Sequence, residues 1–218
     1  MTELIVKAGL SYLLGSVVGS LLIGRLKGGV DIRALGSGNA GATNALRTLG
    51  RAIAFWVLAI DLAKGFVATR LIAPAPLPGI VPAPPALGAW CVTVCALAVM
   101  LGHVYPLWFG LRGGKGVATL VGAVLGIDPW LLASMVLTWL AAVVLFGFVG
   151  LASMLATLAL AVEIAIGNFA PRLPLLAFAV AATALILYTH RSNIARMRAG
   201  TESRARRLWL FGARRGPA

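Results

Sequence analysis

The sequence predicts an all-α integral membrane protein with about seven transmembrane helices, and composition gives the first reason. Of the 218 residues, 60% are hydrophobic and 11% are charged, whereas charged residues make up about a quarter of an ordinary soluble domain. The mean hydropathy is +0.95. A chain of this length cannot bury so much apolar surface in a core of its own, so we expect lipid to cover the remainder.

Seven apolar segments supply the predicted spans, since a transmembrane helix needs about 20 predominantly apolar residues. The segment Gly116–Ile127 is short and is either a tilted helix or a partial span buried by its neighbours; six spans are the fallback. Pro74–Pro85 is predicted to be a stiff connector rather than a helix, and Asp128-Pro129 to be a turn that starts a helix. The seven candidates are Leu4–Gly24, Ala52–Ile72, Ala86–Leu101, Gly116–Ile127, Trp130–Phe146, Leu151–Gly167 and Leu173–Thr189.

Positive charge orients these spans, because cytoplasmic loops are rich in Lys and Arg. The chain has 19 Lys and Arg against 6 Asp and Glu, a net charge of +13, and most of the Lys and Arg fall on one side of the seven spans. We therefore expect the N-terminus outside and the C-terminus in the cytoplasm. One transmembrane domain would cover residues 1–190, with cytoplasmic active-site loops at 25–51 and 102–116. A basic cytoplasmic tail at 191–218 would lie against anionic lipid head groups, so the charge does not call for a nucleic-acid partner.

The first polar segment between spans has the composition of an anion-binding loop. Its glycines allow consecutive N–H groups to converge into a nest, and Arg47 adds a bidentate donor suited to phosphate. The spacing Gly36-x-Gly38-x-x-Gly41 matches the dinucleotide fingerprint, but no strand precedes it, which excludes that site. The alternative is a flexible polar connector. The segment reads Gly36-Ser37-Gly38-Asn39-Ala40-Gly41-Ala42-Thr43-Asn44-Ala45-Leu46-Arg47.

A second polar segment runs directly into an apolar helix, which brings free N–H groups, a helix N-terminus and Lys115 together as an anion site. Gly116 follows Lys115 where a Walker A loop has Ser or Thr, so this is not a nucleotide-binding loop. The alternative is that Arg112 and Lys115 only anchor the helix at the head groups. His103 is either a ligand contact or a hydrogen-bonded helix end. The segment reads Gly102-His103-Val104-Tyr105-Pro106, then Phe109-Gly110-Leu111-Arg112-Gly113-Gly114-Lys115-Gly116-Val117-Ala118-Thr119.

A third polar segment follows the last span. His190 and Asn193 share a face if the last helix continues, and taken alone His190 is an interfacial histidine rather than a catalytic one. The segment reads His190-Arg191-Ser192-Asn193-Ile194-Ala195-Arg196, then Gly200 and Glu202.

Charged residues inside spans are costly and need an explanation. Asp61 and Lys64 lie three apart and are predicted to form a structural pair on one helix face, whereas Glu163 has no explanation from the sequence. The predicted cytoplasmic side has few acidic residues, Asp31 and Glu202 among them. The sequence therefore predicts no metal site and disfavours a magnesium-dependent phosphotransferase.

Taken together, the three polar segments resemble the motifs of the bacterial acyl-phosphate:glycerol-3-phosphate acyltransferases, the PlsY family. They occur in the family's order and spacing from the first span to the tail. Asp61-x-x-Lys64-Gly65 resembles a further short family signature, and one departure is Ala40, where many members have Pro. The matching residues are Ser37-Gly38-Asn39-x-Gly41-Ala42-Thr43-Asn44-x-x-Arg47, Gly102-His103 with Pro106 and Phe109, Gly113 to Thr119, and His190-x-x-Asn193-Ile194-x-Arg196 with Gly200 and Glu202.

The resemblance implies a multi-pass enzyme of the bacterial plasma (inner) membrane. It would move a fatty acyl group from acyl phosphate to the 1-hydroxyl of glycerol 3-phosphate, giving lysophosphatidate and inorganic phosphate in phospholipid biosynthesis. No cofactor and no obligate protein partner are expected. The catalytic residues that hold glycerol 3-phosphate would be Ser37, Arg47, Lys115, His190 and Asn193. Substrate binding would extend to Gly38, Asn39, Gly41, Thr43, Asn44, His103, Gly113, Gly114 and Gly116.

Acyl phosphate is already activated, so positioning and stabilisation of the developing oxyanion suffice, without a covalent nucleophile or a metal. The base is either His190 or the donor's own phosphate, and the scarcity of acidic residues favours the phosphate. A competing hypothesis is a phosphate-ester transporter. It would need polar groups along a path through the bilayer, and the sequence offers few beyond Asp61, Lys64 and Glu163.

Overall fold

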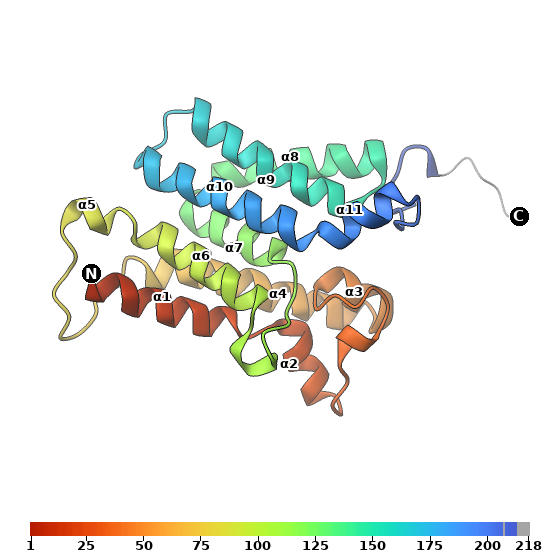
Figure 1. The fold of residues 1–218 in the computed structure, drawn as a ribbon, viewed down its shortest axis with the longest axis horizontal. Helices are drawn as coiled ribbons and strands as arrows, with labels where there is room; N and C mark the ends of the chain where they lie inside the picture. Colours follow the sequence, from red (N-terminus) through yellow and green to blue (C-terminus); the bar gives the residue numbers. More distant parts are fainter. Residues whose placement is uncertain (207, 213–218) are drawn as a thin grey trace, which may run out of the picture. The chain divides into compact units, whose positions relative to one another are not determined.

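The computed structural model describes residues 1–206 and 208–212, and every regular element within those ranges is a helix (Figure 1). The predicted all-α fold class is therefore confirmed. Part of the predicted basic tail, including Arg207, Arg214 and Arg215, lies outside the described residues.

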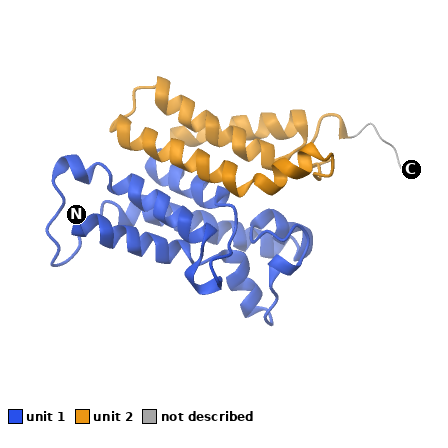
Figure 2. Ribbon diagram, viewed as in Figure 1, with its two compact units in different colours: residues 1–128 blue, residues 129–218 orange. Residues whose placement is uncertain are grey.

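The chain forms two compact units, unit 1 from Met1 to Asp128 and unit 2 from Pro129 onward (Figure 2). The border between the units falls at the Asp128-Pro129 turn. The division into a transmembrane domain at 1–190 and a basic tail at 191–218 stays a prediction. The helix that follows His190 packs against the last two long helices of unit 2, so the beginning of the predicted tail is part of that unit.

Unit 1 is held together by two close helix pairs, α1 with α6 and α4 with α7. A β-carbon on Gly102 of α6 would stand 2.2 Å from the carbonyl oxygen of Tyr12, and one on Gly122 of α7 would stand 1.9 Å from that of Leu62. Such glycines let membrane helices approach backbone to backbone. The elements are α1 (Thr2–Gly15), α2 (Gly19–Leu26), η1 (Ile32–Ala34), α3 (Ala42–Thr48), α4 (Arg51–Val67), the π-helical turn η2 (Ala68–Ile72), α5 (Pro85–Gly88), α6 (Cys91–Val104), η3 (Leu107–Phe109) and α7 (Val117–Ile127).

The first predicted span, Leu4–Gly24, is broken into α1 and α2, which meet at 48°. At the break, the Lys64 ammonium donates hydrogen bonds to the carbonyl oxygens of Gly15 and Val17, both at 2.9 Å. A helix can end in an apolar environment only where its free carbonyls find other partners. Lys64 of α4 supplies them, and periodicity along the sequence could not reveal a partner so distant in the chain.

The Pro-rich connector is non-helical over residues 74–84, as predicted, and α5 begins at its last residue, Pro85. Proline is tolerated there because the first turn of a helix does not use its N–H groups. The Lys7 ammonium lies 2.7 Å from the Glu3 carboxylate and donates to the carbonyl of Ala73, while Glu3 accepts the N–H of Ala83 at 2.6 Å. These contacts fix both ends of the connector to α1.

Unit 2 consists of α8 (Pro129–Phe146), α9 (Val149–Ile166), α10 (Arg172–Thr189) and α11 (Arg191–Arg198). The predicted helix start at Asp128-Pro129 is confirmed. Helix α9 packs against both α8 and α10. Glu163 of α9, which the sequence left unexplained, accepts a hydrogen bond from the Ser134 hydroxyl and so links α9 to α8.

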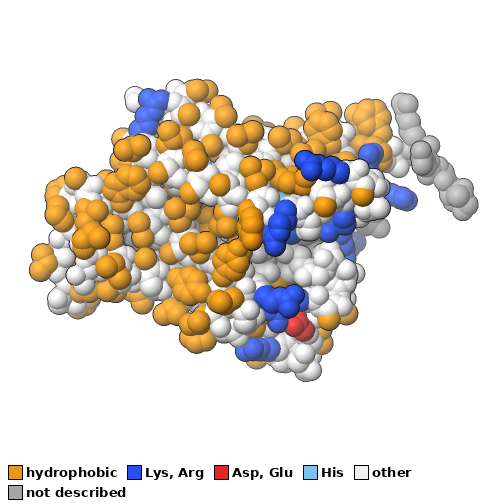
Figure 3. Space-filling view, viewed as in Figure 1, with side chains coloured by type: hydrophobic (Ala, Val, Ile, Leu, Met, Phe, Trp, Pro, Cys, Tyr) orange, Lys and Arg blue, Asp and Glu red, His pale blue; other side chains and the backbone are white. Residues whose placement is uncertain are grey.

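Within the described part of the chain, five helices are long and apolar enough to cross a membrane, and the bent α1–α2 pair gives a sixth span. Helix α7 is a shorter apolar helix, as predicted for Gly116–Ile127. Figure 3 shows apolar side chains over most of the drawn face of each unit, whereas Lys and Arg gather mostly near α2 and α3 in unit 1 and near α11 in unit 2. Such surfaces fit an integral membrane protein. The count of seven and the outside N-terminus stay predictions.

Candidate active site

The first glycine-rich loop is folded around the side chain of Asn44, which is 1% exposed. Its amide nitrogen donates to the carbonyl oxygens of Ile32 and Leu35 at 3.2 and 2.9 Å, and its amide oxygen accepts the N–H of Ser37 at 3.0 Å. A β-carbon on Gly36 would lie 2.3 Å from that oxygen. The sequence predicted a substrate contact at Asn44; the structure places it inside the loop, where it binds backbone groups.

Other predicted residues of this loop face solvent. Ser37, Gly38, Thr43 and Arg47 are exposed, and the last two lie four apart on α3, which places them on one side of that helix. Gly38 has a φ of 71°, open mainly to glycine. The amide of Asn39 folds over Gly41, where a β-carbon would stand 2.8 Å from its nitrogen. The loop thus offers neutral donors and one guanidinium to an anion.

The second glycine-rich loop folds back onto the end of α6. The N–H groups of Gly113 and Gly114 donate to the carbonyls of Val104 and His103 at 3.0 and 3.1 Å. Gly116, with a φ of 87°, then forms the N-cap of α7. The predicted arrangement of a glycine loop running directly into a helix N-terminus is present, with the half-buried Lys115 one residue before the cap.

His103 lies beneath this loop and is 3% exposed. Its Nδ1 is 2.8 Å from the Lys64 ammonium and 3.4 Å from Asp61 Oδ1, so the ring is part of the buried network formed by Asp61 and Lys64. A β-carbon on Gly114 would stand 2.2 Å from Nε2 and 2.8 Å from the carbonyl oxygen of Ala40. The two glycine-rich loops therefore meet at Gly114. His103 is hydrogen-bonded at the end of α6, which was one of its two predicted roles. Its role as a substrate contact stays a prediction.

Asp61 and Lys64 form the predicted pair, with Lys64 Nζ 3.1 Å from Asp61 Oδ1 and both side chains at most 2% exposed. The same carboxylate oxygen accepts the N–H of Gly19 at 3.2 Å. Since Lys64 also binds the carbonyls that end α1, this pair ties α4 to the break between α1 and α2 and to His103. The expectation of a structural pair is confirmed.

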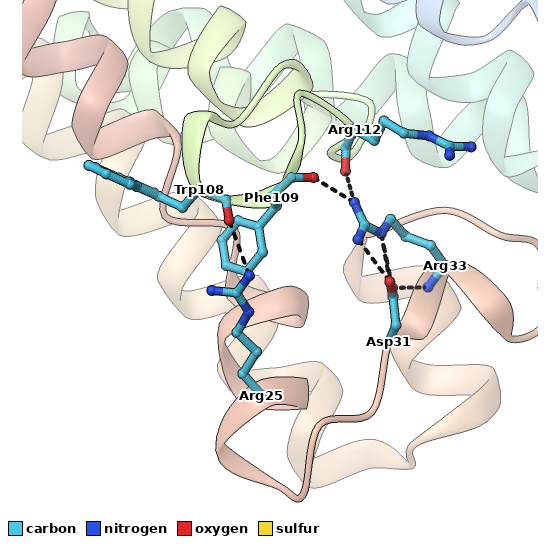
Figure 4. A network of polar contacts seen from close by, with 6 residues as sticks. All are labelled: Arg25, Asp31, Arg33, Trp108, Phe109 and Arg112. Atoms are coloured by element: carbon cyan, nitrogen blue, oxygen red, sulfur yellow. Dashed lines mark hydrogen bonds and ion pairs between the residues drawn. The ribbon is translucent and has the colours of Figure 1, made fainter.

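A further network connects the two loops and was missed by sequence reasoning (Figure 4). The Arg33 guanidinium binds the Asp31 carboxylate and also donates to the carbonyl oxygens of Phe109 and Arg112, both at 2.8 Å. The hydrogen bonds with Arg33 lower the pKa of the Asp31 carboxyl, and the same contact raises the pKa of Arg33. One pattern in the sequence could have indicated this network. Asp31 is one of the few acidic residues of the loop region, and an arginine, Arg33, follows it two positions later.

Beside the Asp31–Arg33 pair, Arg25 of α2 stacks its guanidinium 4.3 Å from the centre of the Phe109 ring and donates to the carbonyl of Trp108 at 3.1 Å. In Figure 4 the Arg112 side chain points away from Asp31 and Arg33. The short turn η3 is thus held by cationic side chains from the first loop region.

The third segment forms a separate cluster in unit 2. Helix α10 ends at Thr189 and α11 begins at Arg191, so His190 stands at a break, not within a continuing helix. Its Nδ1 is 2.8 Å from the carbonyl oxygen of Ile186, which can only accept, so a neutral ring has its lone pair on Nε2. The Asn193 amide nitrogen donates to Glu202 at 2.7 Å, and Arg196 Nε donates to the other carboxylate oxygen at 2.5 Å. His190 and Asn193 are both buried.

Comparison with known proteins agrees with this arrangement of loops and helices. A model of the family described as glycerol-3-phosphate acyltransferase matches residues 5–200. The chain belongs to this family. The glycerol-3-phosphate acyltransferase of Bordetella pertussis is 43% identical over 199 residues, covering 89% of this chain and 88% of that protein. That of Aquifex aeolicus is 39% identical over 194 residues, covering 89% and 95%.

Solved structures of the glycerol-3-phosphate acyltransferase family share the fold. A crystal structure of PlsY, an integral membrane glycerol 3-phosphate acyltransferase in its glycerol 3-phosphate form, matches with a TM-score of 0.81 at 36% identity, over 92% of this chain and 94% of that one. A second, the lysophosphatidic acid form, matches with a TM-score of 0.78 at 35% identity. The resemblance of the three polar segments to PlsY is therefore confirmed, and the chain is a multi-pass membrane acyltransferase of the glycerol-3-phosphate acyltransferase family.

Proposed function

We propose that this enzyme transfers a fatty acyl group from acyl phosphate to the 1-hydroxyl of glycerol 3-phosphate in the bacterial inner membrane, producing lysophosphatidate and inorganic phosphate. The observation that carries the proposal is the meeting of two glycine-rich loops at Gly114, with the exposed Ser37, Thr43 and Arg47 on the first loop. Two compact, positively charged loops suit two small phosphorylated substrates better than one bulky donor.

Glycerol 3-phosphate is assigned to Ser37, Arg47 and Lys115, because a guanidinium binds phosphate in a bidentate manner and an ammonium adds a point charge. The donor phosphate is assigned to the backbone of Asn39–Thr43 and Gly113–Gly116. His190 and Asn193 keep their predicted role as glycerol 3-phosphate contacts. Substitution of each, with Arg191 as an exposed neighbouring control, tests that role.

The transfer needs no covalent intermediate. The substrate 1-hydroxyl oxygen forms a bond to the carbonyl carbon of acyl phosphate, and the bond from that carbon to the phosphate oxygen breaks. The leaving phosphate takes the hydroxyl proton, which balances the step; the Nε2 lone pair of His190 is the alternative acceptor. Loop N–H groups and cations would stabilise the charge that develops on the carbonyl oxygen.

The proposal places both loops in the cytoplasm, where soluble glycerol 3-phosphate is found, and no protein partner is required. A reporter fused at Pro78 should then read outside, and one fused after Arg215 should read inside. The reverse pattern would remove both loops from the cytoplasm and contradict the proposal.

Purified enzyme with radiolabelled glycerol 3-phosphate tests the donor directly. We expect acyl phosphate to support formation of lysophosphatidate and acyl-CoA at equal concentration to support none, because these short loops offer little surface for the adenosine 3′-phosphate and pantetheine arm. Comparable product from acyl-CoA alone would refute the donor assignment and leave the membrane acyltransferase assignment intact.

A further inference from the structure

The guanidinium of Arg33 uses two of its edges at once (Figure 4). Nε lies 2.9 and 3.1 Å from the two carboxylate oxygens of Asp31, and Nη2 lies 2.8 Å from one of them. Nη1 donates to the carbonyls of Phe109 and Arg112, both at 2.8 Å. Asp31 also accepts a hydrogen bond from the backbone N–H of Arg33 at 2.9 Å. The carboxylate that orients the Arg33 side chain is therefore itself held by the Arg33 backbone. We refer to Asp31, Arg33 and these two carbonyls as the loop clamp.

The two clamped carbonyls flank a turn of the second loop. Gly110 has a φ of 66° and Leu111 a φ of 56°, and in the described ranges Leu111 is the one non-glycine residue with a positive φ. A leucine in this conformation is strained and persists only where surrounding contacts hold it. Hydrogen bonds on both sides of the Gly110–Leu111 pair supply such contacts.

The turn leads directly to the predicted substrate groups. Arg112 is followed at once by Gly113 and Gly114, and Arg33 precedes Ser37 by four residues. We propose that Arg33, oriented by Asp31, is a positioning residue for acyl transfer, which sets the Gly113–Gly116 loop against the first loop so that the two loops together can hold the donor phosphate. The inference rests on the proposed function, because it takes acyl phosphate as the ligand of this loop.

Arg33→Lys is the sharpest test, since lysine keeps the charge but one ammonium cannot reproduce the planar fork that reaches a carboxylate and two carbonyls. Loss of loop position should lower kcat/KM for acyl phosphate by about 10- to 100-fold. The KM for acyl phosphate should rise more than the KM for glycerol 3-phosphate, which loses only the Lys115 contact of this loop. Lys27→Gln is the matched control: it removes one exposed cation from the same segment and should leave both constants unchanged.

A second measurement reports how firmly the second loop is held, independently of the reaction. In Arg33→Lys and Asp31→Asn, trypsin should cut after Arg112 faster than in wild type, relative to cutting after Lys27. Three results would contradict the positioning role of Arg33. They are unchanged KM values in Arg33→Lys, an equal rise of its KM values for both substrates, and an unchanged cleavage ratio in both variants. A wild-type enzyme inactive with acyl phosphate would instead count against the proposed function, and the cleavage ratio would still test the clamp.

Discussion

Lys64→Met removes the cation at the centre of the buried network in unit 1. The Lys64 side chain is 2% exposed and lies within 3.1 Å of four acceptors, namely the carbonyls of Gly15 and Val17, Asp61 Oδ1 and His103 Nδ1. The substitution would leave the Asp61 carboxylate, itself 1% exposed, without its cation. Breaking a buried pair from one side costs about 3–5 kcal/mol. For a chain of this size, that loss corresponds to a fall in Tm on the order of 10 °C.

Thermal unfolding in detergent micelles measures the effect, and Lys27→Met is the matched control because it makes the same replacement at an exposed lysine. The double variant Asp61→Leu/Lys64→Met should recover part of the loss, since it removes both buried charges. Recovery stays incomplete because the carbonyls of Gly15 and Val17 and the N–H of Gly19 lose their side-chain partners. If Lys64→Met had the same Tm as Lys27→Met, the stabilising role of the buried Lys64 network would be refuted.

Four further predictions concern the loops. Asn44→Ala should cost about 2–3 kcal/mol, because it leaves two carbonyls and one N–H of the first loop unpartnered; Tm compared with that of Thr48→Ala checks this. Arg47→Lys should lower kcat/KM by about 30- to 100-fold at unchanged Tm. Near-normal turnover would show that Arg47 only helps to orient the membrane spans. Activity should survive excess EDTA, and loss restored by magnesium would contradict the metal-free mechanism. The lowered pKa of Asp31 stabilises the fold above its ordinary value of 3.8, and this contribution is lost as pH falls through the lowered folded value; the Tm difference between wild type and Asp31→Asn should therefore be constant from about pH 8 to 5 and shrink below 3.8.

Composition and apolar periodicity were enough to predict the all-α fold class and the approximate limits of most spans. Long apolar runs dictate helices in a membrane because every backbone group there must be paired within its own segment. Glycine-rich runs beside Arg47 and Lys115 likewise indicated anion-binding loops, since that composition is a local property. The pairing of Asp61 with Lys64 followed from helical spacing alone and holds at 3.1 Å.

The hydrogen-bond partners of the polar side chains came from the folded structure alone. Asn44 and His103 are predicted substrate contacts. In the structure, Asn44 bonds to Ile32, Leu35 and Ser37, and His103 bonds to Lys64. Arg33 drew no prediction and proved to connect both loops. The sequence shows which donors and acceptors exist, but a hydrogen bond is made with whichever partner the folded chain brings within reach, and these partners lie up to 79 positions away. The break between α1 and α2 has a similar cause. The carbonyls of Gly15 and Val17 accept hydrogen bonds from Lys64 of α4, a partner that is distant in the sequence.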